Sequence, residues 1–236
     1  MKSRIYFERL VLISMLFVVT SVVGLCFRAE PSSVALLTKT IQEVSKRTSP
    51  DEWKRASKGE PLLSGDQVRT GQKSIAIVKF IDNSLVRVRE LSELTIQGES
   101  GTPGRLSKTV RLGGGAFGFD IQKQKQNEQF RLTSPTSVAS IRGTQGKMSG
   151  GLGHDTLVVT EGLINFKNSA SNNEIEVPAG YIAFSNEDGS ISSRPATALE
   201  LADANSAATG GLLNNLNLEL RDNQGNKKQL KLQYKK

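Results

Sequence analysis

The stretch LGGGAFGFDI, residues 112–121, decides how this chain folds. It places three consecutive glycines before an alternation of apolar and small or polar residues. Two more glycine-marked stretches follow, IRGT at residues 141–144 and VVTEGLINF at residues 158–166. Short apolar runs spaced by glycines are typical of β-strands joined by tight turns. Few residue types common in catalysis lie among them, so the pattern predicts a β-rich binding or sensing module.

The composition of the 236-residue chain favours the same fold class. Only 6% of the residues are aromatic, so a core must come mainly from Val, Ile and Leu within the 37% hydrophobic fraction. The 22 glycines against 7 prolines suit a turn-rich β protein better than a helical bundle. The length allows one sizeable domain with appendages.

The net charge of +8 lies at the two ends of the chain. Residues 1–29 carry a net +3 and residues 221–236 a net +5, which leaves the body between them neutral. A nucleic-acid-binding fold is expected to show a basic face within its body. We therefore expect no nucleic-acid partner.

The chain has one cysteine, Cys26, and one histidine, His154. A single cysteine forms no intramolecular disulfide, and a tetrahedral zinc site needs several thiolate or imidazole ligands. His154 lies in GGLGHD, residues 150–155, a composition typical of a hairpin tip, so we expect a solvated loop histidine and no catalytic triad. We predict no catalytic residue, no metal site and no cofactor. Carboxylate pairs of the kind that glycosidases use stay open from sequence alone.

Gly113, Gly115 and Gly118 formally match the G-x-G-x-x-G dinucleotide fingerprint. That chemistry needs a helix directly after the glycines, so that its N-terminus faces the pyrophosphate. Residues 117–121 alternate as a strand does. We therefore interpret these glycines as turn positions.

Residues 1–29 have the layout of an export signal or a membrane anchor. Residues 10–27 carry no charge, and they follow the basic residues Lys2, Arg4 and Arg9. This run is long for the apolar part of a signal peptide and near the minimum for a membrane-spanning helix. Both alternatives stay open. In a bacterium, either one places the remaining chain in the periplasm, free or tethered to the inner membrane.

The rest of the sequence divides into three regions. Residues 30–58 form a polar lead-in, whose apolar positions fit one short helical face or a first strand. Residues 59–185 form a series of short strands at regular spacing, which predicts an all-β fold, a single β-sandwich or jelly-roll-like domain. The predicted strands are residues 75–80, 85–89, 94–96, 109–112, 116–121, 130–133, 137–141, 156–160, 163–166, 174–177 and 181–184.

Residues 186–236 form a C-terminal extension that ends in a basic tail. The Ala, Leu and Glu content of residues 196–208 predicts a short helix. Leucines then alternate with polar residues on both sides of Gly225. This pattern fits a hairpin that turns at Gly225 or a loosely ordered amphipathic tail, and we favour the hairpin.

The order of the turn and strand motifs resembles the FecR domain, named for the ferric citrate uptake regulator. GDQVRTG (65–71) is similar to the opening of that domain, and IRGT (141–144) is similar to its Val-Arg-Gly-Thr signature. The resemblance covers residues 59–185, and Gly146 departs from it where the family has a bulky apolar residue. The other matching segments are FIDNS (80–84), VRLGGG (110–115), FRLTSP (130–135), VVTEGLI (158–164) and VPAGYIA (177–183).

The resemblance implies an extracytoplasmic β domain that is often tethered to a membrane. In the best-known members, a cytoplasmic segment acts on a sigma factor and the outer domain receives a signal from a receptor. Only nine residues precede the apolar run here, so we do not expect the sigma-regulating activity. What carries over is a non-enzymatic sensing or protein-interaction module of the envelope, with an envelope protein as its partner.

The resemblance also marks motif residues to which we assign a structural role. They are Gly65, Asp66, Thr70, Gly71, Gly113, Gly143, Thr144, Glu161 and Gly162.

Two groups of basic residues are candidate contact residues. Arg142 lies beside Gly143 in the IRGT stretch, where it would bind an anionic group or cover apolar surface. The second group is the basic tail, Lys227, Lys228, Lys231, Lys235 and Lys236. These lysines point to an alternative function, an envelope module that binds carbohydrate or anionic lipid at the membrane surface or on an acidic cell-wall polymer.

Overall fold

The computed structural model describes residues 33–102, 105–126, 128–210, 216–221 and 227–232. The predicted signal or anchor, residues 1–29, lies outside this part of the chain. Among the described residues, no helix is both long enough and apolar enough to cross a membrane.

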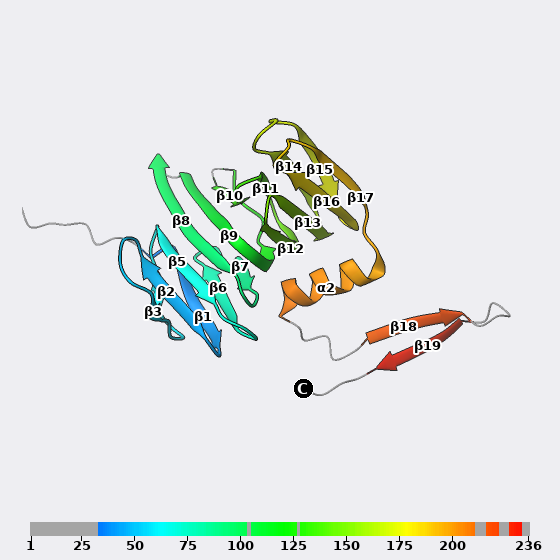
Figure 1. Cartoon of the computed structure of the whole chain (residues 1–236), viewed down its shortest axis with the longest axis horizontal. Coiled ribbons are helices and arrows are strands. Elements are labelled where there is room, and N and C mark those ends of the chain that lie inside the picture. The colour runs from blue at the N-terminus through cyan, green and yellow to red at the C-terminus, as the bar shows by residue number, and fades with distance from the viewer. Residues whose placement is uncertain (1–32, 103–104, 127, 211–215, 222–226, 233–236) are drawn as a thin grey trace, which may run out of the picture. The chain divides into compact units, whose positions relative to one another are not determined.

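Strands β1 to β17 form two sheets, and the chain passes repeatedly between them (Figure 1). The strands before the central one are β1 (Ala35–Ile41), β2 (Val44–Thr48), β3 (Lys54–Arg55), β4 (Pro61–Leu62), β5 (Asp66–Thr70), β6 (Ile75–Phe80), β7 (Leu85–Val88) and β8 (Glu93–Thr102). The central strand and those after it are β9 (Arg105–Ile121), β10 (Glu128–Thr133), β11 (Ser137–Ile141), β12 (Thr144–Gly151), β13 (His154–Glu161), β14 (Leu163–Asn168), β15 (Glu174–Pro178), β16 (Tyr181–Asn186) and β17 (Ile191–Pro195).

Strand β9 belongs to both sheets. Sheet A has the order β4-β1-β6-β7-β9-β12-β13-β16-β17. Sheet B has the order β3-β2-β5-β8-β9-β10-β11-β14-β15. The first part of β9 pairs with β8 and β10 in sheet B, and residues 115–121 pair with β7 and β12 in sheet A. The all-β prediction is confirmed, with β9 as the strand that joins the two halves of the sandwich.

The core lies between the two sheets and follows the strict alternation of the strands. In β9, Phe117 and Phe119 are fully buried, as are Leu132 of β10 and Phe166 of β14. The rings of Phe80 on sheet A and Phe130 on sheet B meet edge to face, with centroids 5.0 Å apart and an interplanar angle of 79°. Aromatic and branched aliphatic side chains from both sheets therefore form one apolar core.

Helix α2 (Ala198–Thr209) packs on the outer face of sheet A over β9, β12 and β13 (Figure 1). Thr197 caps its N-terminus in a capping box with Glu200, and Gly210 ends it in the left-handed conformation. Ala204, Ala207 and Ala208 face the sheet and are buried. The prediction of a helix at residues 196–208 is confirmed.

Gly118 is what allows the helix to come so close to the sheet. A Cβ atom at this position would lie 2.1 Å from the carbonyl carbon and oxygen of Ala207. The backbone of α2 therefore rests directly on β9, and no other residue type fits at this contact.

The last described elements are β18 (Leu216–Arg221) and β19 (Lys227–Leu232), which form an antiparallel hairpin. Its register pairs Leu216 with Leu232 and Leu218 with Leu230. This pairing agrees with the favoured prediction of a hairpin, although Gly225 itself lies outside the described residues.

The described part of the polar lead-in provides β1, β2 and β3, which agrees with the first-strand alternative and not with a helical face, and Leu37 of β1 is fully buried. The structure differs from the sequence-based expectations in two places. No strand was predicted between residues 96 and 109, but residues 97–102 continue β8. The glycines at 113–115 lie inside β9 and not at a turn, because this strand changes sheets there without reversing direction.

The contact between Gly118 and α2 gives a first prediction. We expect Gly118→Val to lower the free energy of unfolding by about 2 kcal/mol, because the added side chain pushes the backbone of α2 off the sheet. Urea denaturation of the purified chain measures this. The matched control is Gly114→Ala in the same strand, where a Cβ atom meets nothing within 4 Å. Equal stability of the two variants would show that α2 does not rest on Gly118.

Candidate functional site

Three adjoining depressions lie at the end of the sandwich where β9 changes sheets, and we call them together the crossover groove. Their volumes are about 500, 430 and 370 Å³. Neighbouring depressions share Gly113, Gly114, Gly115 and the tip of the β12–β13 hairpin, so they form one continuous surface. The lining consists of Arg69, Thr70, Leu91, Ser92, Glu93, Gly113, Gly114, Gly115, Pro135, Thr136, Ser149, Gly150, Gly151, Leu152, Gly153, His154, Asp155, Thr156, Ala170 and Glu187.

The groove exists because the two strands on one side of β9 leave a gap. Pairing with β10 ends at Arg111–Thr133, and pairing with β12 begins at Gly115–Gly150. Among the described strands, residues 112–114 therefore have no partner on that side. On the other side, the register with β8 shifts so that Gly113 is the extra residue of a bulge.

The glycine at the end of this gap is required by space and by backbone conformation. Gly115 has a φ of +89°, and a Cβ atom there would lie 2.6 Å from the Cα atom of Ser92. The Ser92 side chain accepts a hydrogen bond from the Ala116 amide at 2.9 Å and donates one to the Ala116 carbonyl at 3.0 Å. These bonds hold the β7–β8 connection against the crossover.

Two leucines at the rim of the groove combine a left-handed backbone with wide exposure. Leu152, at the tip of the β12–β13 hairpin, has a φ of +52° and is fully exposed. Leu91, in the β7–β8 turn, has a φ of +51° and is 63% exposed. Positive φ at a bulky residue costs of order 1–3 kcal/mol. Glycine or asparagine would avoid this cost, so stability alone does not explain either leucine.

A buried carboxylate supports the floor of the groove from below. Asp155 is 1% exposed, and its Oδ2 accepts hydrogen bonds from the hydroxyls of Ser134, Thr136 and Ser137, the last at 2.7 Å. Asp155 belongs to sheet A, whereas Ser134 and Thr136 lie in the β10–β11 turn of sheet B and Ser137 begins β11. These bonds fix the two walls of the groove relative to each other.

The chemistry of the lining excludes several kinds of site. Charges of both signs border the groove, with Arg69 beside Glu93 and with Glu187 near His154. Among the described residues, no aromatic side chain lines it, and its exposed lining is mostly apolar. Within the described residues, no group of His, Cys, Asp and Glu side chains could hold a metal ion. The groove is therefore suited to a neutral, apolar ligand.

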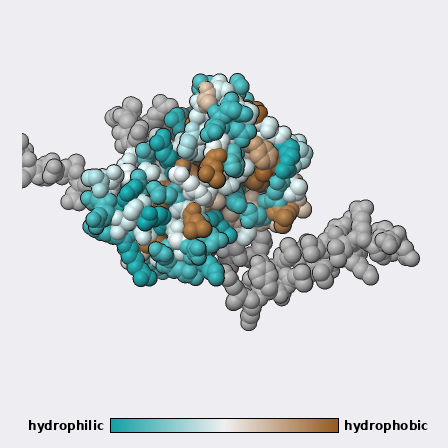
Figure 2. Space-filling view, viewed as in Figure 1, coloured by the Kyte–Doolittle hydropathy of each residue, from teal (hydrophilic) through white to brown (hydrophobic). Residues whose placement is uncertain are grey.

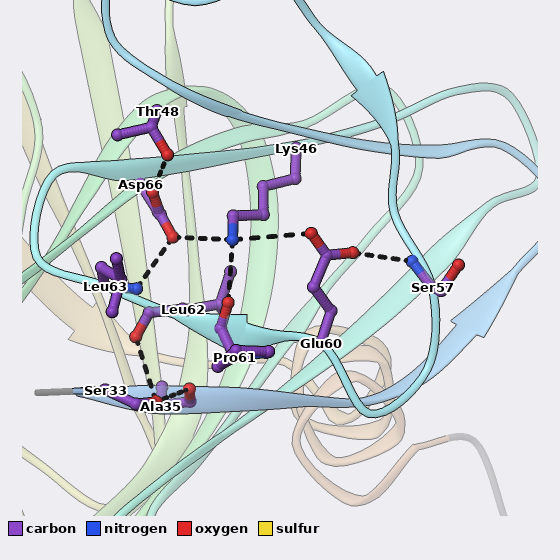
Figure 3. A network of polar contacts seen from close by, with 10 residues as sticks. All are labelled: Ser33, Ala35, Lys46, Thr48, Ser57, Glu60, Pro61, Leu62, Leu63 and Asp66. Atoms are coloured by element: carbon purple, nitrogen blue, oxygen red, sulfur yellow. Dashed lines mark hydrogen bonds and ion pairs between the residues drawn. The ribbon is translucent and has the colours of Figure 1, made fainter.

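The Gly65-Asp66 motif has a structural role (Figure 3). Asp66 is fully buried, and its carboxylate accepts hydrogen bonds from the Thr48 hydroxyl at 2.5 Å and from the Leu63 amide at 2.8 Å. Lys46 Nζ lies 3.0 Å from the same carboxylate and donates to the Pro61 carbonyl at 2.8 Å. The network joins β2, β4 and β5, so the buried charge is satisfied on every side.

The same motif continues into the crossover groove through Thr70. The Thr70 hydroxyl donates to backbone carbonyls in the β7–β8 turn, and it accepts from the Ser92 amide at 3.1 Å. At Gly71, a Cβ atom would lie 2.6 Å from the Glu43 carboxylate. The motif thus packs the turn that presents Leu91.

The IRGT and Glu-Gly motifs meet at the opposite end of the strands. Gly143 has a φ of +82° in the β11–β12 turn, and Gly162 has a φ of +87° after β13. A Cβ atom at Gly162 would lie 2.5 Å from the methyl group of Thr144, so the two turns pack directly against each other. Glu161 and Arg142 are exposed. Arg142 has no hydrogen bond or ion pair with the described residues, which leaves its contact role open.

A buried ion pair at the same end was not expected from the sequence. Lys108 is fully buried, and its Nζ lies 2.5 Å from the Asp82 carboxylate and 3.7 Å from that of Glu128. Burial works to raise the pKa of Asp82, but hydrogen bonds from Lys108, Gln124 and Ser84 outweigh it and hold the pKa below its ordinary value. Lys108 lies among polar residues at the start of β9, ahead of the predicted strand at residues 109–112. The sequence therefore did not predict that its side chain is buried.

The basic-tail lysines are only partly placed. Lys227, Lys228 and Lys231 belong to β19, and Lys235 and Lys236 lie outside the described residues.

Comparisons with known proteins agree with this architecture. Residues 66–165 match the family model described as FecR protein, which confirms the predicted FecR domain over that range. The crystal structure of a candidate anti-sigma factor from Parabacteroides distasonis ATCC 8503, at 2.50 Å resolution, is similar with a TM-score of 0.50 and 12% identity. The similarity covers 66% of this chain and 67% of that chain, and it shows a shared fold.

A second crystal structure of a candidate anti-sigma factor from the same organism, at 1.65 Å resolution, has a TM-score of 0.49 and 11% identity. That similarity covers 66% of this chain and 68% of the other. No curated protein matches the sequence. The FecR match supports a regulatory or sensing role.

The network around Asp66 gives a second prediction. We expect Asp66→Asn to lower the free energy of unfolding by about 3 kcal/mol, because Lys46 loses its buried counter-charge. The control is Asp51→Asn, at an exposed position close to the same strands. Chemical denaturation compares the two variants, and a loss below about 1 kcal/mol for Asp66→Asn would contradict the structural role of the motif.

The ion pair of Asp82 gives a prediction about pH. Because the pKa of Asp82 is lower in the folded chain than in the unfolded chain, its ionised form stabilises the fold above the unfolded pKa of about 3.9. That contribution is lost as the pH falls through the folded pKa. We expect Asp82→Asn to cost about 3 kcal/mol at pH 7 and progressively less below pH 4.

Denaturation curves of wild type and Asp82→Asn between pH 7 and pH 2 measure this difference. Glu174→Gln, at an exposed position on the edge strand β15, is the control and should track the wild type. A deficit of Asp82→Asn that stays constant over the whole pH range would contradict the assignment.

Proposed function

We propose that this chain, with its FecR domain at residues 66–165, is a non-enzymatic sensing module of the bacterial envelope that acts by binding another protein. The FecR match supports a regulatory role. The export-type layout of residues 1–29 motivates the extracytoplasmic location. The crossover groove provides the surface on which a partner would bind.

The observation that carries the proposal is the chemistry of the crossover groove. It is the place where glycines, apolar side chains and two exposed, strained leucines come together on one side of a FecR domain. A catalytic site would need a nucleophile, an acid–base pair or a metal in such a position. Here the carboxylate of Asp155 accepts hydrogen bonds from three hydroxyl groups. His154 is the first residue of β13, next to the tip of the β12–β13 hairpin.

The candidate anti-sigma factors from Parabacteroides distasonis suggest where such a module would act. Regulation of a sigma factor needs a binding event that is passed on by protein contact. In our proposal, this chain is the component that binds a partner protein in the envelope and thereby senses the signal. The apolar lining favours a protein over a charged small ligand.

The location is tested by protease access in intact spheroplasts of the host bacterium. We expect the full chain with a C-terminal epitope tag to be degraded by added protease while a cytoplasmic marker stays intact. A cytoplasmic protein with the same tag and the same expression level serves as the control. A tagged chain that is protected until the inner membrane is lysed would overturn the extracytoplasmic location.

A further inference from the structure

We propose that the crossover groove binds an extended apolar peptide segment of the partner protein. The backbone of the peptide lies over the glycine floor, and its side chains contact Leu91 and Leu152. The inference deepens the proposed function and rests on it for the identity of the ligand as a protein.

The two rim leucines are the first observation behind this inference. Other described residues with positive φ outside glycine are Gln42, Lys73, Asn83 and Asn172, all of which are polar. Leu91 and Leu152 are the apolar members of the set, and both border the crossover groove. Exposed leucines in a left-handed conformation, gathered at one groove, are the features expected of apolar anchors for a ligand.

The glycine floor is the second observation and determines the shape of the ligand. Gly113 and Gly114 have no side chain that would hold a ligand away from β9, and a Cβ atom at Gly114 would point into open space. Successive small residues let another backbone approach closely. An extended peptide matches this flat floor, whereas a bulky globular surface would not enter it.

The gap in strand pairing is the third observation. Residues 112–114 lack a strand partner between the end of β10 and the start of β12 among the described strands. Backbone groups at such a position are satisfied by the backbone of an added segment, as in other cases of peptide recognition at a strand edge. A lipid chain or a sugar does not offer this pattern of donors and acceptors.

The charged residues of the groove indicate which class of ligand it can bind. The described lining contains one arginine, Arg69, against the carboxylates of Glu93, Asp155 and Glu187, so no net positive field attracts phosphate or an acidic polymer. The part of the chain that the structure describes also brings no aromatic ring to the lining on which a sugar would stack. Hence the ligand class is a neutral segment with apolar side chains.

A displayed library of random nine-residue peptides, selected against the purified full chain, tests this inference. We expect the selected peptides to be enriched in Leu, Ile and Val and depleted in acidic and basic residues. The affinity of a selected synthetic peptide is then measured by fluorescence anisotropy on variants of the chain. Leu91→Asn and Leu152→Asn should each weaken it about tenfold or more, which corresponds to about 1.4 kcal/mol.

The Leu91 and Leu152 variants are chosen to keep the fold stable, so that a loss of affinity reports on binding and not on unfolding. Asparagine tolerates the left-handed backbone, so both substitutions should leave the urea midpoint unchanged or raise it. Gly114→Val should abolish binding because its side chain fills the open space above the floor. The matched control is Leu199→Asn on helix α2, an 80% exposed leucine outside the groove, which should bind the peptide like the wild type.

Several outcomes would overturn the inference. Selected peptides without apolar enrichment would do so, as would binding that is insensitive to Leu91→Asn, Leu152→Asn and Gly114→Val. Self-association of the chain that is lost in Leu152→Asn would assign the groove to a second copy. Binding to phosphatidylglycerol vesicles that is lost in the same variant would assign it to a lipid surface. The protease-access experiment is independent of these measurements, so a failure of the location and a failure of the groove are distinguishable.

Discussion

The passage of β9 from one sheet to the other is the constraint on which the rest of the structure depends. A single strand of residues 105–121 is central in both sheets, so the two halves of the sandwich are joined by its backbone. The change of sheet requires glycine at the crossover, since Gly115 adopts a positive φ and a Cβ atom at this position would collide with the backbone of Ser92. The glycine at 118 in the same strand then allows α2 to rest on sheet A. One short stretch therefore determines the sandwich, the helix position and the groove.

The groove follows from this geometry and is not a separate feature. Strand β9 stops pairing with β10 before it starts pairing with β12. A short part of its backbone therefore has no strand partner on that side among the described strands. Natural β proteins cover or blunt such openings. This chain stabilises the walls with the buried Asp155 cluster and leaves the floor bare, with isolated hydrophobic residues at the rim. On the face drawn in Figure 2, hydrophobic residues lie in small separate groups within a mostly hydrophilic surface.

Much of the fold could be predicted from the sequence because it depends on local patterns. Alternating apolar residues predicted β6 and β7, and the tight turn between them contains Asn83 with a left-handed φ of +66°. The interpretation of the glycines at 113–115 as a turn was wrong. Glycines in a sequence show that the backbone is free to adopt unusual conformations. They do not show whether the chain turns back or continues as a strand into the second sheet. The groove and the Lys108–Asp82 pair depend on contacts between distant segments, so local patterns did not predict them. Leu152, a large apolar residue between two glycines, is a local signal that was not used and that lies at the rim of the groove.

The crossover groove is, in our proposal, the surface through which this module binds its partner. The most direct measurement is an NMR titration of the isotope-labelled full chain with a selected apolar peptide. We predict amide shift changes that cluster at residues 91–93, 113–115 and 150–154, with the outer face of sheet B and helix α2 unaffected. Shift changes that avoid the glycines at 113–115 and gather on another face would contradict the account.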